Sequence, residues 1–203
     1  LGEIIGRGGT SGIGVFSFDF GGFIVDGGHS LKSKSSFLPS SASQAKPPQL
    51  LAHYDFPDDW EILLVILDSK NTVNGQKEVN IFQDYCPVPK NEVEQTSHII
   101  FMNMIPFLLE RDLPAFGHSI DEIQKRGFKN VEVSLQSQQI RDLMDKLREI
   151  GAYGVGMSSF GPTVYSVFDK NNKHIVEEIK EYVGNRGIVL TTKAQNYGHE
   201  IQK

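Results

Sequence analysis

Residues 154–168, GVGMSSFGPTVYSVF, are the stretch from which the last third of this 203-residue chain can be interpreted. Its second part, Thr163–Phe168, predicts a strand, and the part before it predicts a loop. Glycine lets a backbone come close to a ligand, while serine hydroxyls and free N–H groups can donate to an anion. The loop is therefore a candidate anion site, and a tight turn that binds nothing is the alternative. Its candidate residues are Gly154, Gly156, Ser158, Ser159 and Gly161.

Periodic apolar residues predict regular elements on both sides of this stretch. A helix is expected over Gln138–Ile150, with Ile140, Leu143, Met144 and Leu147 on one face. Beyond the stretch, His174–Val183 predicts a second helix and Ile188–Lys193 a further strand. A helix–strand–helix–strand order on a mixed sheet is typical of a two-layer α+β half.

The upstream part is predicted in less detail. Buried or short strands are expected at Trp60–Leu67 and Gly22–Asp26, and helices at about 91–110 and 116–125. Residues 75–82 predict a polar loop or a short helix. Residues 27–49 are rich in Ser, Lys, Pro and Ala, which indicates a loop. Phe16–Phe20 alternates weakly, so Asp19 within it faces either a site or, as a strand residue, the solvent.

The bulk composition is that of an ordinary globular chain. It is 39% hydrophobic and 22% charged, with a net charge of -5, which gives no electrostatic footprint for nucleic acid or an anionic membrane. A single cysteine, Cys86, excludes an intrachain disulfide and fits a reducing cytosol. No apolar run approaches the roughly 20 residues that span a bilayer, and no signal peptide is visible. A cytoplasmic location is expected.

A second glycine-rich run lies near the start of the chain, GRGGTSGIGVFSFDFGGFIVDGG at residues 6–28. Arg7 and Ser11 within it are donors that suit a phosphate. Asp26 follows a predicted strand and precedes two glycines, so it is either a ligand for Mg²⁺ or substrate, or a turn-forming residue. His29 could bind phosphate or transfer a proton, and a surface-loop histidine is the alternative.

Together, the two glycine runs resemble motifs of the GHMP kinase superfamily. The first is similar to a Ser-Gly-x-Asp-Asn segment that is followed by Gly-Gly. The second is similar to the late glycine loop of the ferredoxin-like C-terminal half. Within the superfamily, GFIVDGG and SSFGPTVY most resemble the beta-ribofuranosylaminobenzene 5'-phosphate synthase family of methanopterin biosynthesis. The resemblance covers essentially the whole chain.

This resemblance implies an α+β, GHMP-kinase-like fold that ends in a ferredoxin-like half. Residues 1–90 would be the remainder of the N-terminal GHMP-like domain, and residues 91–203 the C-terminal domain. The chain is expected to be the C-terminal part of a longer protein whose preceding segment carries a phosphate-binding Gly-Leu-Gly-Ser loop. The implied reaction is a decarboxylating glycosyl transfer that joins 4-aminobenzoate to phosphoribosyl pyrophosphate with Mg²⁺ and releases CO₂ and pyrophosphate. A homodimer is left open.

One position departs from the kinase pattern. Where a superfamily kinase would place a catalytic aspartate, this sequence has Gly14. Glycine can neither accept a proton nor orient a nucleophile, which counts against phosphoryl transfer and agrees with the synthase. Two alternatives stay open. One is an ATP-dependent small-molecule kinase that uses another base, and the other is a chain that acts only in assembly with the missing half.

The predicted site combines both glycine runs. Asp26 and His29 are the expected catalytic residues, and Asp26 is also the expected metal ligand. Residues that would bind substrate or phosphate are Arg7, Ser11, Gly12, Asp19, Gly154, Gly156, Ser158, Ser159 and Gly161.

Overall fold

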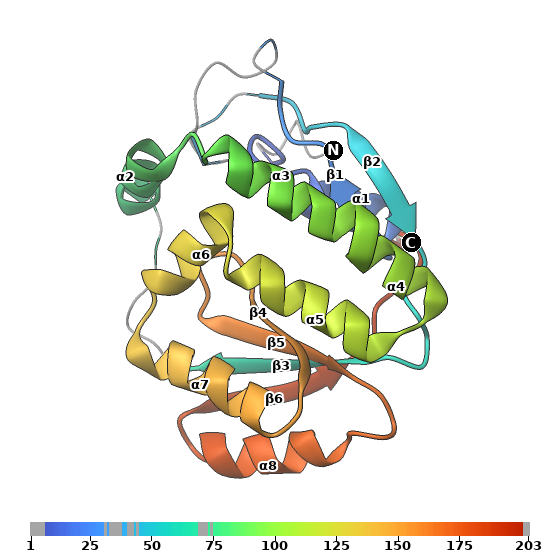
Figure 1. Cartoon of the computed structure of the whole chain (residues 1–203). Coiled ribbons are helices and arrows are strands. Elements are labelled where there is room, and N and C mark those ends of the chain that lie inside the picture. Colours follow the sequence, from blue (N-terminus) through green and yellow to red (C-terminus); the bar gives the residue numbers. More distant parts are fainter. Residues whose placement is uncertain are drawn as a thin grey trace. The chain divides into compact units, whose positions relative to one another are not determined.

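The structure is a computed structural model that describes residues 7–30, 32, 38–39, 43, 45–68, 73 and 75–200 (Figure 1). The chain divides into two compact units. The first unit comprises Leu1–Phe56, Val73–Pro87 and Ala194–Lys203, and the second comprises Pro57–Thr72 and Val88–Lys193. The predicted domain boundary at residue 90 stays a prediction.

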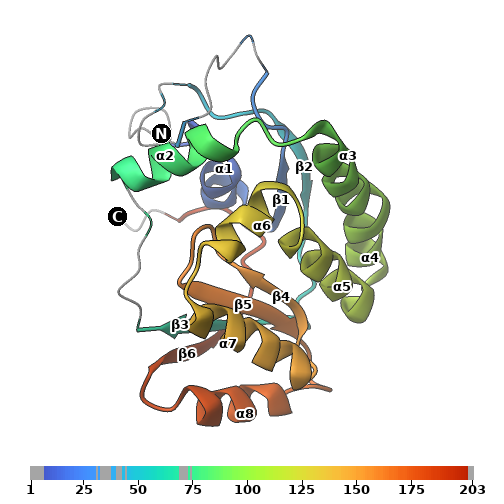
Figure 2. The same cartoon turned by 60° about the vertical axis from the view of Figure 1, so that its left-hand side comes forward.

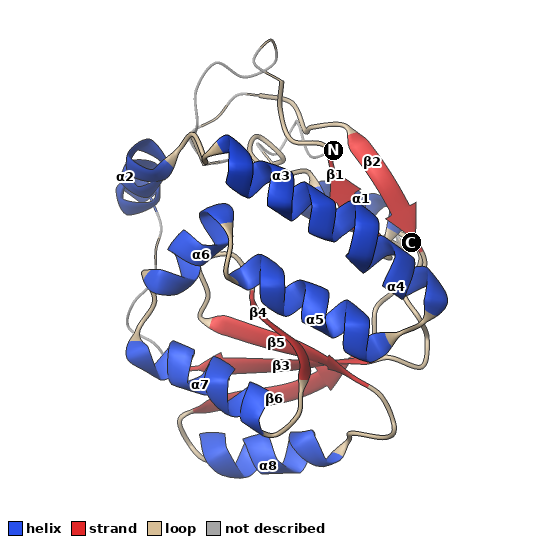
Figure 3. Ribbon diagram, in the orientation of Figure 1, coloured by secondary structure: helices blue, strands red, loops and turns tan. Residues whose placement is uncertain are grey.

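A four-stranded antiparallel sheet organises the second unit (Figure 3). Its spatial order is β4-β5-β3-β6, formed by Tyr153–Met157, Thr163–Phe168, Glu61–Leu67 and Gly187–Thr192. Helices separate β3 from β4 and β5 from β6, while β4 and β5 form a hairpin. This is the ferredoxin-like arrangement, so the predicted α+β class with a ferredoxin-like C-terminal half is confirmed.

The core of the second unit lies between one face of this sheet and helices α7 (Gln138–Glu149) and α8 (His174–Val183) (Figure 2). The predicted apolar face of α7 is fully buried there, and α8 contributes Ile175, Ile179 and Val183 at helical spacing. Burying one such side chain stabilises the fold by about 2 kcal/mol. Helix α5 (Leu113–Gln124) packs on β4.

The predicted helix over 91–110 is confirmed, with an unpredicted change of winding in its middle. It consists of α3 (Lys90–His98), a π-helical segment η2 (Ile99–Met104) and α4 (Ile105–Glu110). Helix α5 starts three residues earlier than predicted, because the Asp112 carboxylate caps it by accepting from the Ala115 N–H at 3.0 Å. Helix α6 (Gly127–Ser134) was not predicted.

The first unit contains α1 (Ile13–Phe20), α2 (Gly75–Tyr85) and a two-stranded antiparallel sheet. Strand β1 (Phe23–Asp26) confirms the predicted strand, whereas its partner β2 (Leu50–Tyr54) was not predicted. The short-helix alternative for residues 75–82 is confirmed by α2.

Extended structure at Phe16–Phe20 is wrong, because these residues belong to α1. The rings of Phe16 and Phe20, four residues apart, stack at 6.5 Å between centroids, as side chains on one face of a helix do. The helix ends at Gly21, whose φ of 72° is readily adopted only by glycine. The predicted loop at 27–49 falls partly outside the described residues.

A C-terminal segment, residues 194–200, packs within the first unit against α1 and Phe56. The Asn196 amide is fixed on both sides, since Oδ1 accepts from the Phe56 N–H at 2.8 Å and Nδ2 donates to the Phe56 carbonyl at 2.9 Å. The His199 N–H donates to the Phe18 carbonyl at 2.8 Å, and the Gly22 N–H to the Gln195 carbonyl at 2.7 Å. Among the described helices, none is long and apolar enough to cross a membrane.

Candidate functional site

Asp26 is the centre of a hydrogen-bonded cluster at the N-terminal end of α1. Its Oδ2 accepts from the Ser11 hydroxyl at 2.8 Å and from the Gly12 N–H at 2.9 Å. Oδ1 accepts from the Gly28 N–H at 3.0 Å. The carboxylate therefore neutralises donors at the helix start, where negative charge is favoured. It joins residues 11–12 to residues 26–28, and both oxygens keep lone pairs that could meet a ligand.

The other predicted residues of the first unit lie outside this cluster. The exposed side chain of Arg7 has no hydrogen-bond or ion-pair partner among the described residues. His29 Nε2 lies 2.7 Å from the Lys46 carbonyl, and since a carbonyl only accepts, this nitrogen carries a proton. Asp19 is exposed on α1. Within the described residues, no group of three or more His, Cys, Asp or Glu side chains could hold a metal ion.

The glycines of the opening run make close packing contacts. A Cβ on Gly8 would lie 2.6 Å from the Pro47 Cγ, and one on Gly12 would lie 2.4 Å from the Phe16 ring. These contacts explain the glycines without a ligand. Gly14 differs, because a Cβ there would meet nothing within 4 Å. The local fold would therefore accept a side chain, including an aspartate, at the position where the kinase pattern has one.

The late glycine run also differs from its predicted form. Gly154 and Gly156 are buried within strand β4, so the predicted loop over this part of the run is wrong. At Gly154, φ is 61° and a Cβ would lie 2.9 Å from the Gly117 Cα, which permits the close contact between α5 and β4. On Gly156 a Cβ would lie 2.4 Å from the Tyr165 hydroxyl oxygen. A glycine-rich strand in contact with a helix was indistinguishable from a loop in the sequence.

Ser158–Pro162 lie outside the strands, and Ser158–Gly161 form a turn. The Gly161 N–H donates to the Ser158 carbonyl at 2.8 Å, and the Ser158 N–H to the Thr163 carbonyl at 2.9 Å. Both serines are exposed, and their hydroxyls have no hydrogen-bond partner in the described part of the chain. Ser158 and Ser159 are therefore the members of the late run that are available to a ligand.

Side chains that the sequence did not single out fix this turn. Lys129 Nζ donates to the Met157 carbonyl at 3.1 Å and to the Ser159 carbonyl at 3.3 Å. The buried amide of Gln136 donates to the Phe160 carbonyl, and buried Gln124 accepts from the Met157 N–H at 3.0 Å. No motif marked these residues, because their role depends on packing between α5, α6 and the hairpin.

Tyr165 lies on β5 and is paired with Gly156 of β4. Burial, together with the negative charges of Asp121 and Glu132, raises the pKa of Tyr165 to about 12. The phenol therefore stays protonated in the folded protein at pH values where an unfolded chain would lose the proton.

The unfolding free energy should consequently fall as the pH rises from about 10 to 12, by about 2–3 kcal/mol in total, because the unfolded state then binds fewer protons. Tyr165→Phe should remove this part of the pH dependence. Urea unfolding between about pH 8 and 12 measures it, with exposed Tyr197→Phe as the matched control. Parallel pH profiles for the parent and Tyr165→Phe would contradict the expectation.

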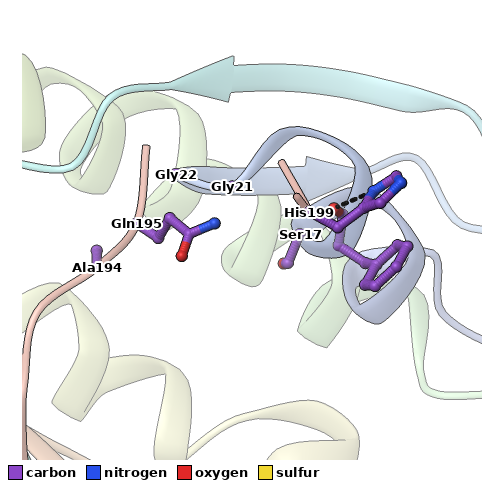
Figure 4. Close-up of a pocket in the computed structure, with 7 residues that line it drawn as sticks. Ser17, Gly21, Gly22, Ala194, Gln195 and His199 are labelled. Carbon is purple, nitrogen blue, oxygen red and sulfur yellow. Dashed lines mark hydrogen bonds between the residues drawn. The ribbon is translucent and has the colours of Figure 1, made fainter. Parts of the chain in front are cut away.

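A pocket of about 360 Å³ opens in the first unit at the C-terminal end of α1 (Figure 4). One wall is the Phe18 ring, stacked on His199 with centroids 4.2 Å apart. Helix carbonyls point toward this end, so the pocket does not favour a phosphate. Along an eight-residue helix it lies roughly 12 Å from the Asp26 cluster. It is lined by Ser17, Phe18, Gly21, Gly22, Ala194, Gln195 and His199.

The predicted site residues thus form two groups. In the first unit, Ser11 and Gly12 meet at Asp26, whereas Arg7, His29 and Asp19 do not join them. In the second unit, Ser158, Ser159 and Gly161 form the turn, and the two remaining glycines serve packing. Which of these residues contact a ligand stays a prediction.

Three curated proteins named beta-ribofuranosylphenol 5'-phosphate synthase are similar to this chain. The protein of Methanothermobacter thermautotrophicus is 52% identical over 198 residues, which are 98% of this chain and 60% of that protein. Those of Archaeoglobus fulgidus and Methanocaldococcus jannaschii are each 47% identical and match 100% and 99% of the chain. The chain spans about 60% of the length of these relatives.

Residues 104–188 match the family model described as GHMP kinases C terminal. Among solved structures, a homoserine kinase from Cytophaga hutchinsonii is similar with a TM-score of 0.60 at 15% identity, covering 88% of this chain and 50% of that one. A structure described as a putative homoserine kinase from Listeria monocytogenes gives a TM-score of 0.58 at 17% identity, covering 91% of this chain and 53% of that one. At these identities the structural likeness concerns the fold alone. The resemblance inferred from the sequence motifs is confirmed.

Proposed function

We propose, on the premise that the chain is a homologue of these synthases and carries a GHMP kinase C-terminal domain, that it forms part of a phosphoribosyl-transferring synthase. The donor would be phosphoribosyl pyrophosphate and the acceptor a para-substituted benzoate. The ring carbon that bears the carboxylate attacks the anomeric carbon of the ribose. The bond between that carbon and pyrophosphate breaks, and its electron pair leaves with the pyrophosphate. The carboxyl group then leaves as CO₂, and its bonding electrons restore the aromatic ring.

The observation that carries the proposal is the lack of an acidic residue in the first turn of α1. A kinase of the resembling type would need a carboxylate there, and Gly14 has room for one without carrying it. The proposed transfer needs no base at that position. Its transition state has oxocarbenium character, so it needs positioned reactants and donors that accept the charge of the leaving pyrophosphate.

Asp26 is the residue that would hold the Mg²⁺ ion which neutralises the charge of the leaving pyrophosphate. A carboxylate held by three donors keeps a fixed direction, and its remaining lone pairs suit a hard cation. Mg²⁺ commonly binds through one or two carboxylates together with substrate phosphates and water, so a single carboxylate fits it. Bound there, the ion would neutralise charge on the leaving pyrophosphate.

The remaining roles follow from charge and exposure. Exposed Arg7 would bind a phosphate or the benzoate carboxylate. His29, whose Nε2 donates to the Lys46 carbonyl, would contact the substrate through its other ring nitrogen. The hydroxyls of Ser158 and Ser159 would add neutral donors to the substrate.

The two candidate acceptor substrates differ in a single substituent of the benzoate ring. The sequence motifs suggested 4-aminobenzoate, whereas the names of the curated relatives contain ribofuranosylphenol. A phenol product requires a hydroxyl in place of the amino group, so 4-hydroxybenzoate is the second candidate acceptor. Both substituents donate electrons to the ring position that attacks, and the proposed chemistry is the same for both.

The test uses the full-length protein with phosphoribosyl pyrophosphate, Mg²⁺ and either benzoate, without ATP. Release of CO₂ and pyrophosphate in equal amounts is expected, and the ratio of the two rates identifies the acceptor. ATP consumption on a hydroxylated substrate without CO₂ release would overturn the proposal in favour of a kinase. Activity that returns only when residues 1–203 are mixed with a separate upstream segment would support the assembly alternative.

A further inference from the structure

The turn Ser158–Gly161 contains a residue in an unfavourable conformation. Ser159 has a φ of 47°, in the left-handed region that residues with a side chain rarely adopt. Glycine would adopt this φ without strain. A strained residue persists when its surroundings over-determine it, and the neighbouring side chains show how this is achieved.

Lys129 binds one carbonyl directly before the turn and one within it. Its ammonium donates to Met157 at 3.1 Å and to Ser159 at 3.3 Å, and it forms an ion pair with Glu132 one turn further along α6. An ammonium group has three donors, so these contacts use all of them. The Lys129 and Glu132 side chains are only 22% and 10% exposed, which protects the contacts from solvent.

The direction of the Ser159 carbonyl determines what the turn presents on its other side. In a trans peptide the carbonyl and the following N–H point in opposite directions, so the Phe160 N–H points away from Lys129. The two serine side chains are exposed, as described above. The direction of the Phe160 N–H therefore depends on the Ser159 carbonyl, which Lys129 holds in place.

We infer that Lys129, supported by Glu132, is a positioning residue that keeps the Ser158–Gly161 turn in the conformation that binds substrate. The inference rests on the proposed function, in which this turn contacts phosphoribosyl pyrophosphate. Lys129 contacts the backbone of the turn and Glu132, and it acts on the substrate through the two serines. Its charge is already matched by Glu132, so its role is geometric.

A double variant separates positioning from stability. Removing Lys129 alone would leave the carboxylate of Glu132 buried without a partner and could unfold the protein. Lys129→Met/Glu132→Leu instead replaces the ion pair by apolar side chains, a change that is often neutral for stability. The matched control is Lys180→Met/Glu177→Leu, which removes a pair of the same i,i+3 spacing on α8 that is exposed.

Two measurements on the full-length protein test the inference. In Lys129→Met/Glu132→Leu, amide hydrogen exchange at Phe160 should accelerate at least tenfold, and KM for phosphoribosyl pyrophosphate should rise at least tenfold with a smaller change in kcat. Thermal midpoints and the control variant should stay near the parent. Lys129→Arg, which can still donate to both carbonyls, should recover part of the loss.

Unchanged exchange and unchanged KM in the folded double variant would overturn the inference. If the parent protein forms no product from either benzoate, the proposed function fails instead. The exchange rates at Ser158–Gly161 would then still decide whether Lys129 holds the turn, because they require no substrate.

Discussion

Replacement of Gly198 by alanine is expected to lower the free energy of unfolding by about 3 kcal/mol, since overpacking at this site cannot be relieved by a rotamer change. The added Cβ would lie 2.0 Å from the Asp19 carbonyl oxygen and 2.7 Å from its carbon. Both are backbone atoms of α1. The C-terminal segment would have to move away from the helix, and the hydrogen bond from the His199 N–H to the Phe18 carbonyl would break.

Urea unfolding measures the loss, and trypsin cleavage after Lys193, directly before the segment, measures its detachment. Gly14→Ala, within helix α1 itself, is the matched control, because the added Cβ would meet nothing within 4 Å. That variant should gain about 0.5 kcal/mol, since alanine loses less backbone entropy than glycine in a helix. Equal stability and equal cleavage for the two variants would show that the segment does not pack on α1 as described.

Asp26→Asn is expected to lower kcat/KM for phosphoribosyl pyrophosphate more than tenfold in the full-length protein, if the charge of this carboxylate takes part in the reaction. A tenfold change corresponds to about 1.4 kcal/mol of transition-state stabilisation. An asparagine can keep one oxygen toward Ser11 and Gly12, but its NH₂ group would face the Gly28 N–H, which now donates to Oδ1. The unfolding free energy should therefore also fall, by about 1–3 kcal/mol.

The loss of catalysis and the loss of stability are separated by measuring kcat/KM and the free energy of unfolding in one set of variants. Asp84→Asn, which changes an exposed carboxylate on α2, should alter neither. Ser11→Ala removes one bond to the Asp26 carboxylate without changing its charge, so it should cost about 1 kcal/mol of stability. A destabilised Asp26→Asn variant with parental turnover would restrict Asp26 to shaping the helix start.

Most elements of the second unit could be predicted from the sequence because their apolar patterns are long. The buried face of α7 and the strand at Glu61–Leu67 carry repeated signals that tertiary contacts then satisfy. Helix α6 and strand β2, with eight and five residues, carry too few positions for a period to emerge. Strand β4 was missed for another reason, since two of its five residues are glycines.

The residues of the candidate site also divide into those that the sequence could predict and those that it could not. Asp26 could be singled out because a carboxylate after a strand and before two glycines is a local pattern. Lys129 and Gln136 could not, because both act on backbone groups more than twenty residues away. A charged residue in a short helix has no local feature that distinguishes such a contact from a solvated surface charge.

The sequence by itself determined the α+β fold, its apolar core and the resemblance to the GHMP superfamily, since periodicity and motif wording are local properties. Only the tertiary structure decided what the glycines do. Gly8 lies against Pro47, Gly21 against Gln195 and Gly154 against Gly117. A glycine that meets a ligand and one that meets a distant backbone have the same composition and spacing, and the difference lies in which atom stands where a Cβ would be.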